Sequence, residues 1–196
     1  MRRQQFVVRM TVFVLAGLVY WGVPSSAKDA GEAIAIPAAT VADYVHAVIE
    51  ADRTFYTIHV VERLQARGVV AATENWRITN SLPLPAQFLR ESADLAARTG
   101  SKIGYRLISL WPINKQNGPG DEFERAGLQD VLVNQGHTYT GTVTQGGDRY
   151  FQAIYADRAV SQACIGCHNA HPNSPKRDFK PNDVMGAIVI SIPLGQ

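Results

Sequence analysis

The chain has 196 residues, of which 46% are hydrophobic and 18% charged, and it contains only two cysteines. These values suit one domain with an end segment and exclude a disordered chain, a coiled-coil rod and a disulfide-stapled miniprotein. The formal charge is +2, but residues 1–27 hold three arginines and no acid, so the remaining 16 basic and 17 acidic residues give −1. This balance provides no basic surface for a nucleic-acid partner.

The N-terminus has the pattern of an export signal. Three arginines precede an apolar run over residues 10–23, and Ser25 and Ala27 are small residues that suit a signal-peptidase site. The run is shorter than the roughly 20 residues of a spanning helix, so we predict a cleaved signal peptide over residues 1–27. An uncleaved inner-membrane anchor is the alternative. Both interpretations place the rest of the chain in the periplasm.

Residues 28–40 are rich in small side chains and predict a linker. Beyond it, apolar periodicity and turn residues predict a series of helices and strands. Helices are expected at residues 41–67, 83–98 and 121–133, and strands at 105–110, 137–144, 149–155 and 183–193. The sequence Gln145-Gly146-Gly147-Asp148 predicts a hairpin turn between the second and third of these strands. The order places most helices before an antiparallel sheet, so residues 41–196 are predicted to form one α+β domain.

Both cysteines lie in the sequence Cys164-Ile165-Gly166-Cys167-His168. This C-x-x-C-H spacing is typical of haem c attachment, in which the two thiols form thioether bonds and the adjacent histidine becomes the proximal ligand of the iron. Attachment takes place outside the cytoplasm, in agreement with the export signal. The sequence therefore predicts one covalently bound haem c.

Three other interpretations of the cysteines remain open. A thioredoxin-type redox pair usually lies near the start of an α/β unit, whereas this pair lies late in the chain. A zinc site would add His171 to the motif residues, but four ligands within eight residues leave the backbone little room for a tetrahedron. A disulfide between cysteines three apart closes a very small loop and adds little stability.

The second axial ligand of the iron would decide between electron transfer and small-molecule binding. At about 100° per residue on the helix at 41–67, His59 falls within an apolar stripe and His46 falls on the polar side. The other members of this stripe are Val41, Val45, Val48 and Phe55. A buried imidazole needs a polar partner, so His59 is the first candidate for the second axial ligand. The alternative is that His59 is a core histidine hydrogen-bonded within the protein. Met185 is the second candidate and an open position the third.

The remaining candidates have supporting roles. His171 follows His168 too closely to reach the opposite haem face, and His137 is predicted to be a surface residue. Haem propionates near an apolar pocket need cations. Arg90, Arg106, Arg149 and Lys176 are candidates for that contact, against the alternative of solvated charges.

The residues around the motif resemble the Tll-type haem domain, a family of exported single-haem c domains of PAS-like fold. The resemblance spans nearly all of residues 41–194. It rests on FYTIHVVERLQ (55–65), ENWRITNSLPLPAQFLR (74–90), YRLISLWPINKQNGP (105–119), FERAGL (123–128), ACIGCHNAHPNSPKRDF (163–179) and DVMGAIVISIP (183–193). It implies a PAS-like antiparallel sheet with a long N-terminal helix packed over the haem. Some members have an axial cysteine on that helix, which this chain lacks, and His59 is the natural replacement.

These observations favour a periplasmic mono-haem cytochrome that transfers electrons to and from redox partner proteins after processing by the haem c maturation machinery. The alternative is a haem-based redox or gas sensor that signals through another protein. An enzyme acting on a small oxidised nitrogen species or peroxide is the third interpretation, and the absence of a convincing distal acid–base group ranks it last.

Overall fold

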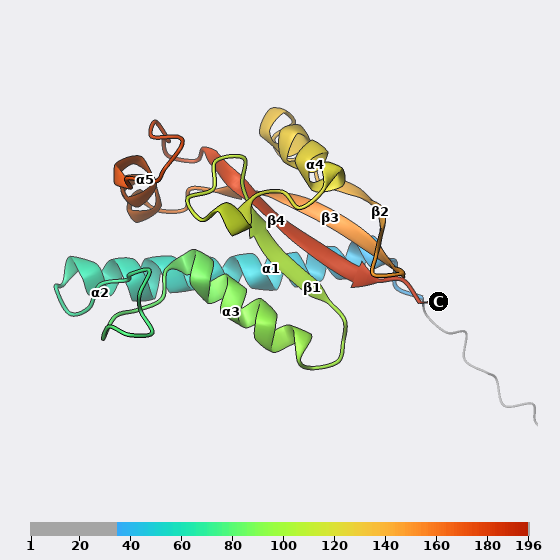
Figure 1. The fold of residues 1–196 in the computed structure, drawn as a ribbon, viewed down its shortest axis with the longest axis horizontal. Helices are drawn as coiled ribbons and strands as arrows, with labels where there is room; N and C mark the ends of the chain where they lie inside the picture. Colours follow the sequence, from blue (N-terminus) through green and yellow to red (C-terminus); the bar gives the residue numbers. More distant parts are fainter. Residues whose placement is uncertain (1–34, 196) are drawn as a thin grey trace, which may run out of the picture. The chain divides into compact units, whose positions relative to one another are not determined.

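The computed structural model describes residues 35–195, so the predicted signal peptide and most of the predicted linker lie outside the described part of the chain. A four-stranded antiparallel sheet lies at its centre (Figure 1). Its strands are β1 (Gly104–Ile108), β2 (Tyr139–Gln145), β3 (Asp148–Arg158) and β4 (Val184–Pro193), in the order β1-β4-β3-β2. All four strands fall where the sequence predicts them, and the predicted α+β class is confirmed.

The three predicted helices appear in the predicted order, and two segments that were not predicted as helical, at residues 115–117 and 162–170, are added to them. The first helix is continuous from α1 (Ala38–Phe55) through a π-helical stretch η1 (Tyr56–Glu62) to α2 (Arg63–Ala66), so it begins inside the predicted linker. The others are α3 (Pro85–Ala97), a short 3-10 turn η2 (Lys115–Asn117), α4 (Glu122–Val133) and α5 (Gln162–Ala170). Among residues 35–195, no helix is long and apolar enough to cross a membrane.

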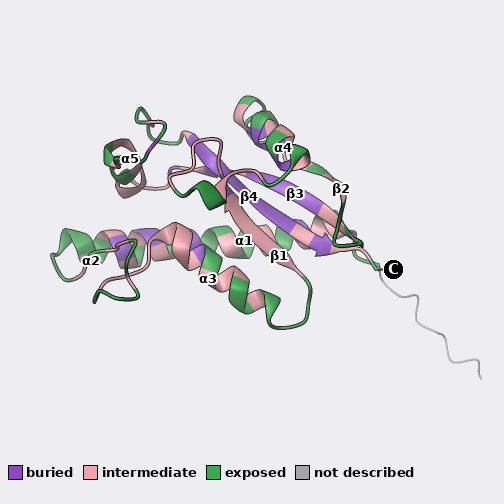
Figure 2. Ribbon diagram, in the orientation of Figure 1, coloured by how far each residue is buried: buried purple, intermediate pink, exposed green. Residues whose placement is uncertain are grey.

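Strand β4 is buried along almost its whole length because both faces of the sheet are covered (Figure 2). Helices α1 and α3 pack against one face and α4 against the other (Figure 1). Successive residues of a strand therefore pack on opposite faces of the sheet. On the α1 face lie Ile188 of β4 and Tyr155 of β3. On the α4 face lie Val189 of β4 and Ile154 of β3. The uninterrupted apolar run of β4 is the sequence signature of a strand covered on both sides.

The hairpin between β2 and β3 confirms the turn predicted from Gln145-Gly146-Gly147-Asp148. Gly146 and Gly147 both have positive φ, +59° and +90°. That conformation is easily adopted by glycine and matches the twist of the flanking strands. The pairing of Gln145 with Asp148 closes the turn and sets the register of the rest of the hairpin.

A candidate haem c pocket

Helix α5 presents the C-x-x-C-H residues on one face, because positions separated by three or four residues are neighbours on a helix. Ser161 caps the helix, and its hydroxyl accepts a hydrogen bond from the backbone N–H of Cys164 at 3.4 Å. Cys164 and His168 are half-buried, and Cys167 is exposed. Both cysteines are free thiols in this structure.

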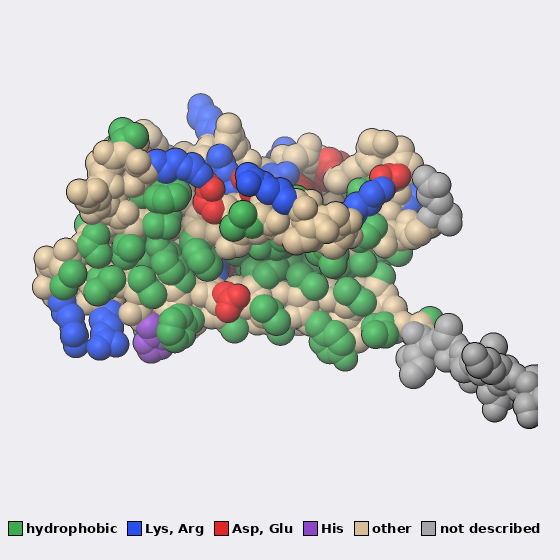
Figure 3. Space-filling view, turned by 90° about the horizontal axis from the view of Figure 1, so that it is seen from below, with side chains coloured by type: hydrophobic (Ala, Val, Ile, Leu, Met, Phe, Trp, Pro, Cys, Tyr) green, Lys and Arg blue, Asp and Glu red, His purple; other side chains and the backbone are tan. Residues whose placement is uncertain are grey.

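The three side chains line a cavity of about 1190 Å³. Its other walls come from the α1–η1 helix, residues 72–87, the ends of β1, β3 and β4, and the loop that follows β1. A cavity of this size exceeds the usual volume of a small-molecule site and can hold a large cofactor. Figure 3 shows hydrophobic side chains over much of the α1 and α3 side, including the end where α2 lies.

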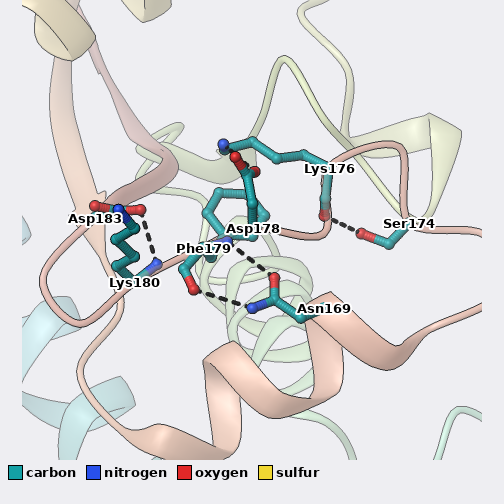
Figure 4. A network of polar contacts seen from close by, with 7 residues as sticks. All are labelled: Asn169, Ser174, Lys176, Asp178, Phe179, Lys180 and Asp183. Atoms are coloured by element: carbon teal, nitrogen blue, oxygen red, sulfur yellow. Dashed lines mark hydrogen bonds and ion pairs between the residues drawn. The ribbon is translucent and has the colours of Figure 1, made fainter.

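The loop that follows α5 is hydrogen-bonded back to the helix through Asn169 (Figure 4). The Asn169 side chain donates to the Phe179 carbonyl and accepts from the Phe179 N–H, both at 3.0 Å. The buried Phe179 ring then meets His168 edge-on, with the ring centroids 5.9 Å apart, and also contacts Trp111 edge-on. The orientation of His168 is therefore set by packing that lies outside the motif itself.

The imidazole of His168 has the properties of a neutral metal ligand. Burial lowers its pKa, and the nearby His171 acts in the same direction. Its Nδ1 atom is buried and has no hydrogen-bond partner within the described residues. A neutral ring with an unsatisfied nitrogen on a cavity wall fits a cofactor that supplies an iron.

His59 does not lie in this cavity. Its side chain is exposed and contacts the exposed Phe55, with ring centroids 4.9 Å apart and the ring planes tilted by 44°. The prediction that His59 belongs to the buried stripe is wrong. The stripe that packs on the sheet runs through Val45 and Ile49, beside the predicted one. The π-helical turn of η1 then shifts the angular positions further, because it has more residues per turn than an α-helix.

His46 is also placed differently from the prediction of a polar-side residue. Its ring stacks on Tyr155 at a centroid distance of 3.9 Å, and its side chain is only 15% exposed. Burial lowers the pKa of His46, although Glu50, 3.8 Å away, acts in the opposite direction. His137 is exposed as predicted and lies 2.6 Å from Asp130.

Two other ligand candidates do line the cavity. Met185 is buried and packs with Ile165 and Phe179, on the α5 side. His171 follows directly after α5, and its Nε2 atom lies 3.2 Å from a carboxylate oxygen of Glu74. Both candidates thus belong to the same side of the cavity as His168.

Only one of the two main propionate candidates reaches the cavity. Arg90 lines it and donates to the Gln116 side chain at 3.3 Å. Arg106 is not among the lining residues. It donates to the Gly118 carbonyl at 2.7 Å and lies 3.5 Å from the buried carboxylate of Glu124.

The sequence analysis missed a buried ion pair in the cavity wall. Arg53 of α1 donates to Asp157 of β3, and their side chains are only 7% and 9% exposed. Burial lowers the pKa of Arg53, and a negative charge on Cys164 or Glu50 would act in the opposite direction. The Arg53 Nε atom is buried and unpartnered among the described residues. The available signal was its spacing, four residues beyond Ile49 on the stripe that packs on the sheet.

A protein family and a solved structure are similar to this chain. The model of the Tll0287-like family matches residues 25–193. Among solved structures, the crystal structure of the cyanobacterial heme-protein Tll0287 is similar, at 15% sequence identity. That match covers 83% of this chain and 99% of the other, with a TM-score of 0.48. No curated protein matches the chain.

Proposed function

Because this chain belongs to the Tll0287-like family, and because its C-x-x-C-H helix borders a large cavity, we propose that it is an exported protein carrying one haem c. In this proposal Cys164 and Cys167 form the two thioether bonds and His168 binds the iron. The single observation that carries it is the shared direction of these three side chains toward one cavity. The family match supports haem binding, and the motif supports the covalent form.

The residues present fit this group. The cavity supplies two free thiols, an imidazole with an unsatisfied nitrogen and mainly apolar walls. Arg90 is available for a propionate at the edge of the cavity. When bound, haem supplies an iron that changes oxidation state and accepts a further ligand.

The working function that the geometry favours is reversible binding of a small ligand, as in a haem-based sensor. The α1–η1 helix contributes Arg53, Thr57 and Val61 to the cavity, and none of these is a strong iron ligand. The available ligands Met185 and His171 lie on the α5 side with His168. A sixth position facing the long helix would therefore remain exchangeable.

Electron transfer is the second candidate, because Met185 and His171 do border the cavity. A movement of the start of β4 that brings Met185 to the iron would give the haem two firm protein ligands. Such a haem would suit exchange of electrons with redox partner proteins in the periplasm. An enzymatic role would need a distal acid–base group as well as an exchangeable position.

The test is the absorption spectrum of full-length protein produced with a haem c maturation system. We expect haem that resists acid-acetone extraction, and its loss in the Cys164→Ala/Cys167→Ala variant. Prompt carbon monoxide binding by the reduced protein would support an exchangeable position, whereas a low-spin spectrum that ignores carbon monoxide would favour electron transfer. Haem that washes out of the unmodified protein would refute covalent attachment.

A further inference from the structure

We propose that Arg53, held by Asp157, is the hydrogen-bond donor for a small anionic ligand of the haem iron. This inference rests on the proposed function and deepens it by naming the ligand class. Arg53 lies in the helix wall that lacks an iron ligand, so it is the charged group available to a molecule bound on that side.

The buried Arg53 side chain has one hydrogen-bond donor, Nε, that is available to a ligand. Only 7% of its side chain is exposed, and it pairs with Asp157 through Nη2. The Nε atom has no partner among the described residues. An unmade hydrogen bond from a buried charged group is unfavourable, so a ligand that accepts from Nε would gain a charge-assisted hydrogen bond in a poorly solvated site.

The neighbours on the helix wall do not compete for this role. The Thr57 hydroxyl donates back to the Arg53 carbonyl at 2.7 Å and is used within the helix. Val61 is apolar. Asp157 engages one end of the guanidinium and fixes its direction, because a forked guanidinium bound by a carboxylate loses its freedom to rotate.

The position of Arg53 argues against a propionate contact. Asp157, which accepts from its guanidinium, is two residues before Ala159, and Cys164 packs against the cluster that contains Ala159. Thioether bonds form at the vinyl groups of haem, and the propionates leave the opposite edge of the ring. A cation close to Cys164 therefore suits a ligand above the ring, and Arg90 remains the candidate for a propionate.

Arg158 provides a matched control in the same cavity. It follows Asp157 directly in β3 and also lines the cavity. Its guanidinium is already engaged, since Nη1 donates to the Asn182 carbonyl at 2.9 Å and both Nη atoms donate to Gln135 at 3.3 Å. Removing its charge changes the electrostatics of the cavity without removing an unused donor.

The experiment measures azide binding to the oxidised full-length haem protein and the carbon monoxide stretching frequency of the reduced protein. The test variant is Arg53→Met/Asp157→Val, which removes both charges and leaves neither partner buried alone. We expect azide affinity to fall about tenfold to a hundredfold and the carbon monoxide stretch to move to higher frequency, because a charged donor is lost. Arg158→Gln should change both values far less than the double variant does, because its donors are already engaged within the protein.

The outcomes separate this inference from the proposed function. Covalent haem that binds azide equally well with and without Arg53 overturns the inference and leaves the haem assignment intact. Covalent haem that binds no azide in the unmodified protein also overturns the inference. Loss of affinity of similar size in Arg158→Gln would indicate a general charge effect and overturn it as well. Absence of covalent haem refutes the proposed function itself.

Discussion

The buried pair of Arg53 and Asp157 allows a quantitative test of the structure. Removing one partner leaves the other charge in a site where both side chains are less than 10% exposed. Such unpaired buried charges typically lower the free energy of unfolding by about 3–5 kcal/mol. We therefore expect Arg53→Met and Asp157→Val each to destabilise the protein by that amount. The double variant should be much closer to the unmodified protein, because paired apolar replacements are often neutral.

The assay is urea unfolding of the full-length protein followed by far-ultraviolet circular dichroism. For a slope of about 2 kcal/mol/M, each single variant should lower the unfolding midpoint by roughly 1.5–2.5 M. The melting temperature should fall by roughly 6–20 °C. The matched control is the exposed pair of Arg77 and Glu91, whose side chains are 55% and 34% exposed, and its loss should leave the midpoint almost unchanged. Single variants as mild as this control, or additive effects in the double variant, would refute the buried pair.

Three further changes test other parts of the structure. His59→Ala should leave the absorption spectrum of the haem protein unchanged, because His59 is exposed outside the cavity. A shift of this variant to a high-spin spectrum would show that His59 binds the iron. Gly186→Ala should lower the free energy of unfolding by about 1–3 kcal/mol in urea titrations, because a new Cβ would collide with the Ile108 carbonyl oxygen; an unaltered midpoint would contradict this close approach. Lowering the pH from 7.5 toward 5 should destabilise the protein through His46, whose pKa is lowered by burial. The unfolded chain then takes up a proton below its ordinary value of 6.5 while the folded chain resists it. His46→Phe should reduce this dependence in unfolding curves at the two pH values, and an unaltered dependence would exclude His46 as its source.

Local patterns were sufficient to predict most of the fold. The apolar run of β4, the glycine pair of the hairpin and the proline-initiated helix α3 each have a short-range physical cause, and all three appear in the structure. Helix α5 was not among the predicted elements, although the C-x-x-C-H spacing is one that brings the three side chains to one face of a helix. These features depend on neighbours within a few residues.

The helix wall of the cavity could not be predicted in the same way. Val41 and Val45 fit both the expected stripe and the observed one, so hydrophobicity alone did not decide between them. The expected stripe turned out to contain exposed residues such as Val48 and Phe55, each 62% exposed. The π-helical stretch added a change of register that a constant angle per residue does not include.

The Arg53–Asp157 pair lies where two core patterns continue into the cavity. In β3, Ala153 and Tyr155 face α1, and Asp157 follows them on that face with the period of a strand. In α1, Ile49 is followed one turn later by Arg53. Both positions would accept apolar side chains without loss of stability, since a buried ion pair contributes little beyond a well-packed hydrophobic pair. The Arg53–Asp157 pair is therefore better explained by the hydrogen-bond donor that it presents to the cavity than by a contribution to the stability of the fold.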